Sequence, residues 1–285
     1  MFKLNMMRTI IFFGFLFAII IQAQSSNVFV VPKPQRISKT SEKFVFEPGQ
    51  VGLHLLQFDS KPLQLAVEDL QREIKAKTGI EAALGTESKY NIRIGNPEKH
   101  ENLEHQAKKL QIWPGPRIDP QGYVLYIGNS QILILASHDA GLFYGIQTLK
   151  QLIRASEKAS ELPGLHIVDW PELRYRGMQD DISRGPVPTL DYMKLQVRRC
   201  AEMKLNLMSY YVEHVVKTEQ YADFAPANGS ISIAQWKELD DYARMHFVQL
   251  MGNFQSLGHF EKIMAFPQYR HLGETDRMIS PVIPG

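Results

Sequence analysis

The sequence has a single cysteine, Cys200, among its 285 residues. One thiol forms no disulfide within the chain, and no histidine stands at a spacing that would make Cys200 a metal ligand or an activated nucleophile. Apolar neighbours at Leu195, Val197 and Ala201 follow a helical pattern. We therefore expect Cys200 to be a buried thiol in the core.

Motifs for metals and cofactors are also absent from the sequence. It contains no HExxH, no CxxC pair, no P-loop and no GxGxxG, and its histidines do not fall at ligand spacings. We therefore expect neither a metal nor a cofactor.

The sequence has no strong excess of positive or negative charge: it contains 32 basic and 30 acidic residues, which give a net charge of +2. The basic residues form no stripe and no repeat interleaved with aromatics, so nucleic acid is not an expected partner. A content of 44% hydrophobic and 10% aromatic residues is typical of a globular chain. Its length fits two ordinary domains or one large barrel.

A long hydrophobic run occurs at the amino terminus, where Lys3 and Arg8 precede an apolar stretch over residues 9–21. That stretch is short of the roughly 20 residues that a membrane span needs. The small residue Ala23 follows it, which completes the outline of a secretory signal peptide. We expect residues 1–23 to be removed, the protein to be exported to the periplasm or the exterior, and no stable membrane span to remain.

The first half of the remaining chain mixes strands and helices. Gly79 ends one amphipathic helix, and Gly128, Asn129 and Ser130 form a hairpin signal between two apolar strands. The predicted strands cover residues 28–31, 91–95, 122–127 and 131–136, and the predicted helices cover 64–78 and 140–153. We expect a small α+β domain over residues 24–168, closed by the polar stretch 156–163.

Residues 169–285 follow another rhythm, in which strand and helix alternate. Ser232 precedes Gln235 by three residues, which is a capping-box spacing. The predicted strands cover residues 175–183, 205–212 and 247–255, and the predicted helices cover 190–204 and 232–246. This alternation indicates βαβ units and a parallel sheet, and hence an α/β fold.

The second segment is too short for a whole eight-stranded βα barrel, which takes roughly 250 residues. Three to four units fit, and an open three-stranded parallel sheet would leave unpaired edges. Two arrangements remain: a truncated TIM barrel, which we favour because the MISPVIPG ending resembles an interrupted loop, or a small doubly wound sheet.

The stretch RYRGMQDDISRG opens the second segment with a strand that carries unusual charge. The carboxyl ends of barrel strands are where such folds place ligand-binding residues. Asp180 and Asp181 are adjacent, however, so their side chains point to opposite faces of a strand. They are therefore not expected to act together on one bond.

Several of these motifs together resemble a known family. GYVLYI, ILILASHDAGLFYGIQTLKQLI and IVDWPELRYRG, followed by RGMQDDISR, by KLN at 204–206 and by QSLGH at 255–259, resemble the β-N-acetylhexosaminidases of glycoside hydrolase family 20. The resemblance extends over residues 28–281 and is densest over 122–206. It implies a non-catalytic amino-terminal domain followed by the start of a catalytic barrel.

The resemblance also implies roles for single residues. Arg184 matches the arginine that binds hydroxyls of the terminal N-acetylhexosamine, and a planar guanidinium suits paired hydroxyls. Asp181 matches the acid that orients this arginine. His259 matches a histidine beside the catalytic carboxylates. The alternatives are an ordinary Asp-Arg surface pair and an exposed loop histidine.

The segment LMSYYVEHVVK departs from most of the family and resembles its hexosaminidase D branch. By this likeness Glu213 and His214 become candidates for sugar contacts, and Tyr210 or Tyr211 for a stacking face. The alternative is a buried Tyr-Glu pair that only packs inside the barrel.

The chemistry of the family depends on an adjacent Asp-Glu pair after the fourth strand. The Glu protonates the glycosidic oxygen, and the Asp orients the 2-acetamido group of the substrate, which attacks the anomeric carbon. No Asp-Glu pair follows His259. We therefore expect the catalytic residues beyond Gly285 and an inactive fragment.

The resemblance favours an exported glycoside hydrolase that releases terminal GlcNAc or GalNAc from oligosaccharides or glycoconjugates. Two alternatives stay open: another exported barrel glycosidase, of the α-glucuronidase or O-GlcNAc-removing type, and a non-catalytic glycan-binding protein. The sequence leaves the oligomeric state open.

Overall fold

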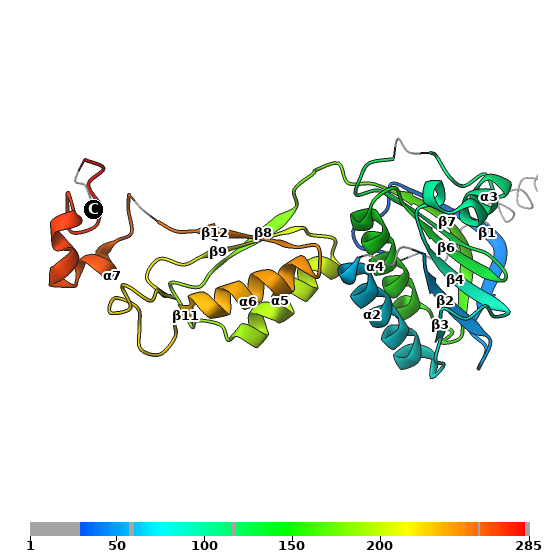
Figure 1. Cartoon of the computed structure of the whole chain (residues 1–285), viewed down its shortest axis with the longest axis horizontal. Helices are drawn as coiled ribbons and strands as arrows, with labels where there is room; N and C mark the ends of the chain where they lie inside the picture. Colours follow the sequence, from blue (N-terminus) through cyan, green and yellow to red (C-terminus); the bar gives the residue numbers. More distant parts are fainter. Residues whose placement is uncertain (1–28, 57–59, 116–117, 256, 283–285) are drawn as a thin grey trace, which may run out of the picture.

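The computed structural model describes residues 29–282 except 57–59, 116–117 and 256. The predicted signal peptide over residues 1–23 lies outside the described residues. The chain folds into two units that lie side by side along the long axis of the molecule (Figure 1). No helix within the described ranges combines the length and the apolar character needed to cross a membrane.

The first unit is built on a seven-stranded mixed sheet in the order β1-β7-β5-β6-β4-β2-β3. Strands β1, β7, β5 and β6 pair antiparallel, and β6, β4, β2 and β3 pair parallel. The strands are β1 (Arg36–Val45), β2 (Val51–Leu55), β3 (Ala83–Leu84), β4 (Tyr90–Gly95), β5 (Tyr123–Ile127), β6 (Gln131–Leu135) and β7 (Glu161–Asp169).

Helices cover both faces of this sheet. Helices α2 (Lys61–Thr78) and α4 (Asp139–Ala155) lie together on one face, and α3 (Glu101–Lys109), after the 3-10 turn η2 (Pro97–Lys99), lies on the other (Figure 1). Neighbouring residues of β5 and β6 alternate between two apolar clusters, one under each set of helices. This alternation is the period of two that a sheet buried on both faces requires.

Helix α4 lies very close to the sheet because two of its residues have no side chain. A Cβ atom on Gly141 would lie 2.2 Å from the backbone oxygen of Gly122, and one on Gly145 would lie 2.5 Å from Cγ2 of Ile134. Distances this short are not compatible with van der Waals contact. The AGLFYG segment therefore needs glycine at both positions.

The second unit contains a three-stranded parallel sheet in the order β12-β9-β8. Helices α5 and α6 connect these strands, a two-stranded pair β10-β11 lies in the connection after β9, and two short helical segments follow β12. The elements are β8 (Gly177–Asp181), α5 (Leu190–Glu202), β9 (Leu207–Tyr211), β10 (Val216–Lys217), β11 (Ile231–Ser232), α6 (Ile233–Arg244), β12 (Gln249–Asn253), α7 (Glu261–Met264) and η3 (Pro267–Leu272).

The structure confirms the predicted helices and all predicted strands but one, including the hairpin β5-β6, whereas elements such as β1, β2, α3 and β7 were not predicted. Helix α2 ends at Gly79, whose φ of 73° is the left-handed conformation that glycine adopts easily. Ser232 and Gln235 form both hydrogen bonds of the capping box at α6. Cys200 is buried at 1% exposure, and burial raises the pKa of its thiol.

The strand predicted over residues 28–31 is wrong for the described residues 29–31, which are irregular. Pro32 and Pro34 follow them and have no amide hydrogen to give to a sheet. The edge strand β1 starts instead at Arg36, and β7 starts at Glu161, inside the stretch predicted to be a polar closing loop. Most residues of β1 are exposed and polar. The alternation of apolar and polar residues that predicts a strand is therefore absent from this segment.

Candidate functional site

The predicted sugar-binding residues meet at the carboxyl ends of β8 and β9. The guanidinium of Arg184 donates through Nη1 to Oδ2 of Asp181 and through Nη2 to Oε1 of Glu213, both at 2.8 Å. Its Nη2 also lies 3.2 Å from Nδ1 of His259. Three segments far apart in the sequence therefore converge on one arginine.

A tight turn after β8 directs Arg184 toward these partners. Asp181 is the last residue of the strand, and its Oδ1 accepts hydrogen bonds from the Ser183 amide at 3.0 Å and the Ser183 hydroxyl at 2.6 Å. An aspartate that bonds the amide two residues ahead forms an Asx turn. This turn brings Arg184 back over the end of its own strand.

Two residues of the site adopt backbone conformations that are unusual for residues other than glycine. Glu213, in the turn after β9, has φ of 36°, and His259, beyond β12, has φ of 60°. The Glu213 side chain is 7% exposed, and its Oε1 lies 3.9 Å from Nδ1 of His259. Strained backbone of this kind is found preferentially at functional sites.

Tyr211 supplies an aromatic surface next to the arginine. The Arg184 Cζ atom lies 5.2 Å from the centre of the Tyr211 ring, within cation-π range. The His259 ring stands edge-on to the same ring at 6.5 Å. Arg184 therefore lies between an aromatic face and two carboxylates.

These contacts also shift proton affinities. The Tyr211 phenol, followed by the Asp181 carboxylate, raises the pKa of Arg184 above its ordinary value. Desolvation opposes ionisation of Asp181, but the Ser183 hydroxyl and amide, together with Arg184, outweigh it and hold the pKa of Asp181 below its ordinary value. Both effects favour the charged forms of the pair.

Tyr210 and Asp180, which the sequence analysis also named, lie on the other face of the sheet from this group. Tyr210 turns to the helix side of the sheet, where its hydroxyl donates to Gln196 and its ring packs on Trp236. Asp180 also faces the helix side, because it accepts from Gln196 at 2.7 Å. The expectation that Asp180 and Asp181 point apart is therefore confirmed, and Tyr211 is the tyrosine beside Arg184.

His214 does not join the group around Arg184. Its Nδ1 atom is buried with no hydrogen-bond partner among the described residues. Desolvation, only partly offset by Glu213, lowers the pKa of His214. Glu213 thus accepts from Arg184, whereas the adjacent His214 makes no hydrogen bond to Arg184 among the described residues, a difference that motif matching does not predict.

Sequence reasoning missed a row of amides beside this group. Asn253 on β12 donates to Gln179 on β8 at 3.1 Å and accepts from Gln255 at 3.2 Å. Ser209 of β9, paired in register with Gln179, has a buried hydroxyl that finds no hydrogen-bond partner within the described part of the chain. Gln179 and Asp181 are two residues apart on β8, so they lie on the same face of the sheet. This alternation could have predicted from the sequence that Gln179 lies beside Asp181.

The chemistry available to this group is binding. The side chain of Arg184 is 52% exposed, and its contacts use only some of its five N–H donors. The rest can meet paired hydroxyls, while Tyr211 offers an apolar surface. Within the described ranges, no three His, Cys, Asp or Glu side chains cluster in a way that would hold a metal ion.

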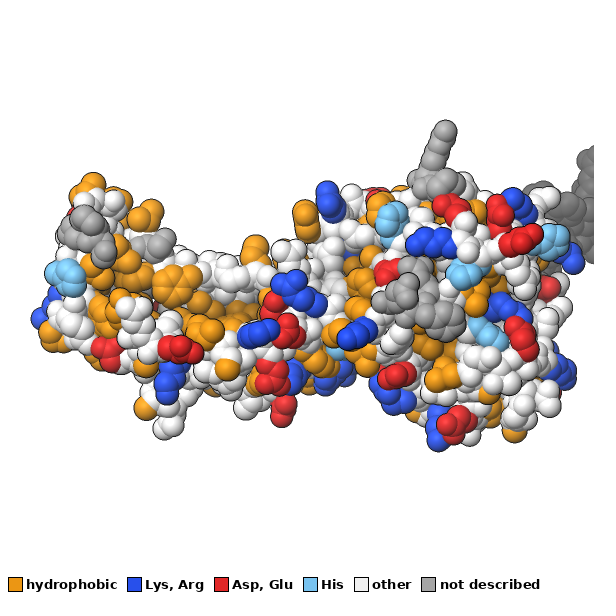
Figure 2. All heavy atoms as spheres, in the orientation of Figure 1, with side chains coloured by type: hydrophobic (Ala, Val, Ile, Leu, Met, Phe, Trp, Pro, Cys, Tyr) orange, Lys and Arg blue, Asp and Glu red, His pale blue; other side chains and the backbone are white. Residues whose placement is uncertain are grey.

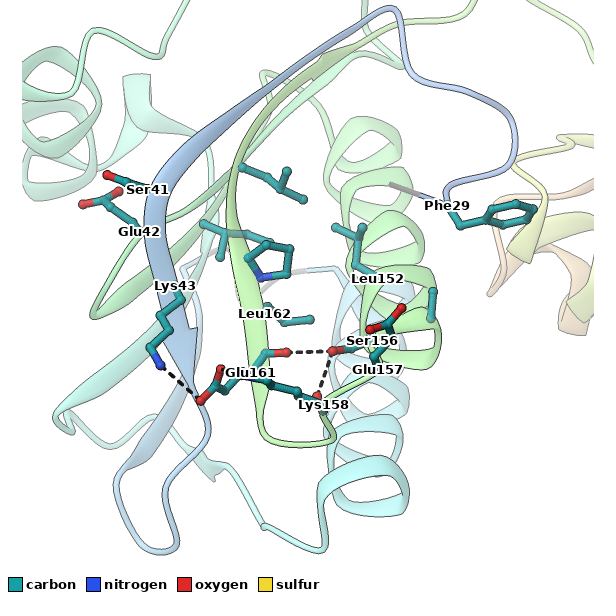
Figure 3. A pocket seen from close by; sticks show the side chains of 14 residues that line it. Phe29, Ser41, Glu42, Lys43, Leu152, Ser156, Glu157, Lys158, Glu161 and Leu162 are labelled. Carbon is teal, nitrogen blue, oxygen red and sulfur yellow. Dashed lines mark hydrogen bonds and ion pairs between the residues drawn. The ribbon is translucent and has the colours of Figure 1, made fainter. Parts of the chain in front are cut away.

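A separate pocket lies in the first unit, between strands β1 and β7 and the end of α4 (Figure 3). Its volume is 420 Å³, and an ion pair between Lys43 and Glu161 crosses its rim. None of the predicted sugar-binding residues lines it. The pocket and the Arg184 group are therefore different sites.

Comparison with known proteins gives the family of the chain. The family model described as "Glycosyl hydrolase family 20, domain 2" matches residues 27–170. A β-hexosaminidase of Porphyromonas gingivalis is 25% identical over 264 residues, which cover 84% of this chain and 32% of that protein. The β-hexosaminidase subunit alpha of Bos taurus is 25% identical over 177 residues, or 57% of this chain and 34% of that protein.

Solved structures share the fold. A chitobiase of Flavobacterium johnsoniae superposes with a TM-score of 0.70 at 19% identity, over 91% of this chain and 41% of that one. An N-acetyl-β-hexosaminidase of Streptomyces plicatus gives 0.68 at 20% identity, over 89% and 50%. The chain spans about a third of the length of the curated relatives named above. It belongs to glycoside hydrolase family 20.

Proposed function

We propose that the chain is the amino-terminal part of an exported β-N-acetylhexosaminidase, which releases terminal GlcNAc or GalNAc from glycans by substrate-assisted retaining hydrolysis. Residues 24–168 are its non-catalytic domain, and residues 169–285 are the first three to four βα units of its TIM barrel. The curated relatives above carry the name β-hexosaminidase, which supports this proposal.

The arrangement of the second unit supports a barrel wall over a doubly wound sheet. Its strand order runs in one direction, β8 to β9 to β12, and right-handed crossovers then place both connecting helices on one face. Figure 1 shows α5 and α6 on that one face. A doubly wound sheet has helices on both faces.

The other face of this sheet has no covering layer among the described residues. Met251 is 45% exposed there, and in Figure 2 the outline of the molecule is hollowed on that side, with hydrophobic side chains visible over the second unit. Parallel sheets are normally covered on both faces. Further strands of a barrel would provide that cover.

The main support for a sugar-binding role is the position of Arg184, which lies between Asp181 and Glu213 at the carboxyl ends of two parallel strands. This is the end of a barrel where ligands bind. The two carboxylates orient the guanidinium, its free donors bind paired sugar hydroxyls, and Tyr211 packs on the apolar face of the ring. In this proposal the Asp-Glu pair required for hydrolysis of the glycosidic bond lies beyond Gly285.

Two measurements on the purified chain test the proposal. An NMR titration with N-acetylglucosamine should shift amide signals in residues 183–185, 211–214 and 258–260 and leave those of α3 unchanged. A chromogenic N-acetylglucosaminide should not be hydrolysed. Turnover by this chain would contradict our placement of the acid, and shifts confined to the first unit would contradict the assigned site.

The alternatives give different outcomes. A glycan-binding protein would bind the sugar without hydrolysing it. Hydrolysis would then also be absent from any longer polypeptide that contains this chain. A glycosidase of the α-glucuronidase type would cleave a glucuronide and not an N-acetylhexosaminide. Export is tested separately, by sequencing the amino terminus of the secreted protein.

A further inference from the structure

One side chain of the first unit holds the beginnings of two strands of the second. The Oε1 atom of Gln121 accepts hydrogen bonds from Nη2 of Arg176 at 2.9 Å and from Nδ2 of Asn206 at 3.2 Å. Arg176 directly precedes β8, and Asn206 directly precedes β9. A single amide oxygen therefore joins the amino ends of both strands to the first unit.

Backbone atoms reinforce this bridge. The Arg176 amide donates to Oδ1 of Asn206 at 2.8 Å, and its Nε donates to the carbonyl of Lys204 at 2.9 Å. Nε2 of Gln121 donates to the Arg174 carbonyl at 3.0 Å. Because main-chain groups take part, the bridge fixes the path of each strand as well as its side chains.

Lys204 makes a second connection. Its Nζ donates to the Tyr123 hydroxyl at 2.9 Å and to Oδ2 of Asp169 at 3.0 Å, and both partners belong to the first unit. The residue is 6% exposed and has φ of 58°. A buried ammonium needs its partners, so few arrangements of the two units satisfy it.

The strands carry this spacing to the sugar-binding group. β8 and β9 pair in register from Gly177 with Leu207 to Asp181 with Tyr211, and the Ile182 amide donates to the Tyr211 carbonyl at 3.2 Å. Five residues extend about 13 to 17 Å in a strand. In the described part of the chain β8 is an edge strand, with β9 as its one neighbour.

We infer that Gln121 and Lys204 are positioning residues, through which the first unit sets the relative placement of Arg184 and Glu213 at the far ends of β8 and β9. The value of that placement for sugar binding rests on the proposed function. The first unit, which lies at the amino ends of β8 and β9 (Figure 1), thus contributes to the site without touching the ligand.

Hydrogen exchange of the whole chain tests this inference. In Gln121→Leu, amides in residues 181–185 and 211–215 should exchange about tenfold faster, equivalent to about 1.4 kcal/mol. Gln121→Glu keeps the acceptor oxygen for Arg176 and Asn206 but loses the donor to the Arg174 carbonyl, so exchange in these two ranges should stay clearly slower than in Gln121→Leu. Lys237→Ala, which removes an exposed ion pair on α6, is the control for a general surface effect.

The outcomes separate the two proposals. Faster exchange only at residues 174–177 and 204–207, or equal effects in Gln121→Leu and Gln121→Glu, would overturn the inference. Faster exchange at the far ends in a chain that binds no sugar would support the positioning role and contradict the proposed function. If Gln121→Leu does not fold, Gln121→Ala provides the same comparison.

Discussion

Nη2 of Arg184 lies 2.8 Å from Oε1 of Glu213, although 29 residues separate them in the sequence. Glu213 is largely buried and Arg184 is half exposed, with side-chain exposures of 7% and 52%. We expect a double-mutant cycle of Arg184→Gln and Glu213→Gln, followed by urea unfolding, to give a coupling of about 1 kcal/mol, because solvent screens the exposed partner. Additive effects would show that the pair does not interact in solution.

Ser209 gives a prediction of the opposite sign. Its hydroxyl is buried without a hydrogen-bond partner among the described residues, and a polar atom in that position destabilises the fold. Ser209→Ala should therefore raise the free energy of unfolding by about 0.5 to 1 kcal/mol. A loss of stability on thermal unfolding would mean that the hydroxyl has a partner, such as an ordered water.

The glycines of α4 should tolerate no side chain. Gly141→Ala places a methyl group against a backbone oxygen that cannot move aside, so we expect a loss of about 1 to 3 kcal/mol. This overcomes the gain in helix propensity of about 1 kcal/mol. Gly252→Ala is the control, since nothing lies within 4 Å of its Cβ position; equal melting temperatures for the two variants would refute the close approach.

His246 should make stability depend on pH. Burial lowers its pKa below the ordinary 6.5, although a hydrogen bond with the Tyr242 carbonyl opposes the shift. Between the lowered folded value and 6.5 the unfolded chain binds more protons, so the free energy of unfolding falls as pH falls through that window. His246→Asn keeps a donor for Tyr242 and should show a shallower fall, and parallel curves for the two proteins would contradict this account.

The amino terminus gives a prediction about processing. The positive start, the apolar stretch and Ala23 indicate cleavage before Gln24. Mass spectrometry of the exported protein should therefore find Gln24 as its first residue. A mature protein that keeps Met1 would show that the segment is a membrane anchor or is not processed.

Much of the fold follows from local sequence signals. The capping box at Ser232, the helix end at Gly79 and the turn between β5 and β6 are each contained in a few neighbouring residues, and each is found in the structure. Strand β1 was missed because its residues are mostly exposed and polar. An edge strand of this kind is held by pairing with a distant segment, and a single sequence does not show that pairing.

The candidate site was predictable to a similar degree. Motif likeness named Arg184, Asp181, Glu213, Tyr211 and His259, and the structure brings these five together. The Nδ1 atom of His214 has no hydrogen-bond partner among the described residues, and its role as a sugar contact stays a prediction. The roles of Gln121 and Lys204 depend on contacts between the two units, which local patterns do not contain.

In the proposed function, Arg184 binds hydroxyls of the terminal sugar. A calorimetric titration of N-acetylglucosamine into the chain, into Arg184→Gln and into Arg198→Gln tests it most directly, since Arg198 is an arginine of α5 outside the site. We expect Arg184→Gln to weaken binding about tenfold or more, from the loss of charge-assisted hydrogen bonds worth about 1.5 to 3 kcal/mol. Arg198→Gln should bind like the unaltered chain. Equal affinities for all three proteins, or no binding by any of them, would contradict the claim.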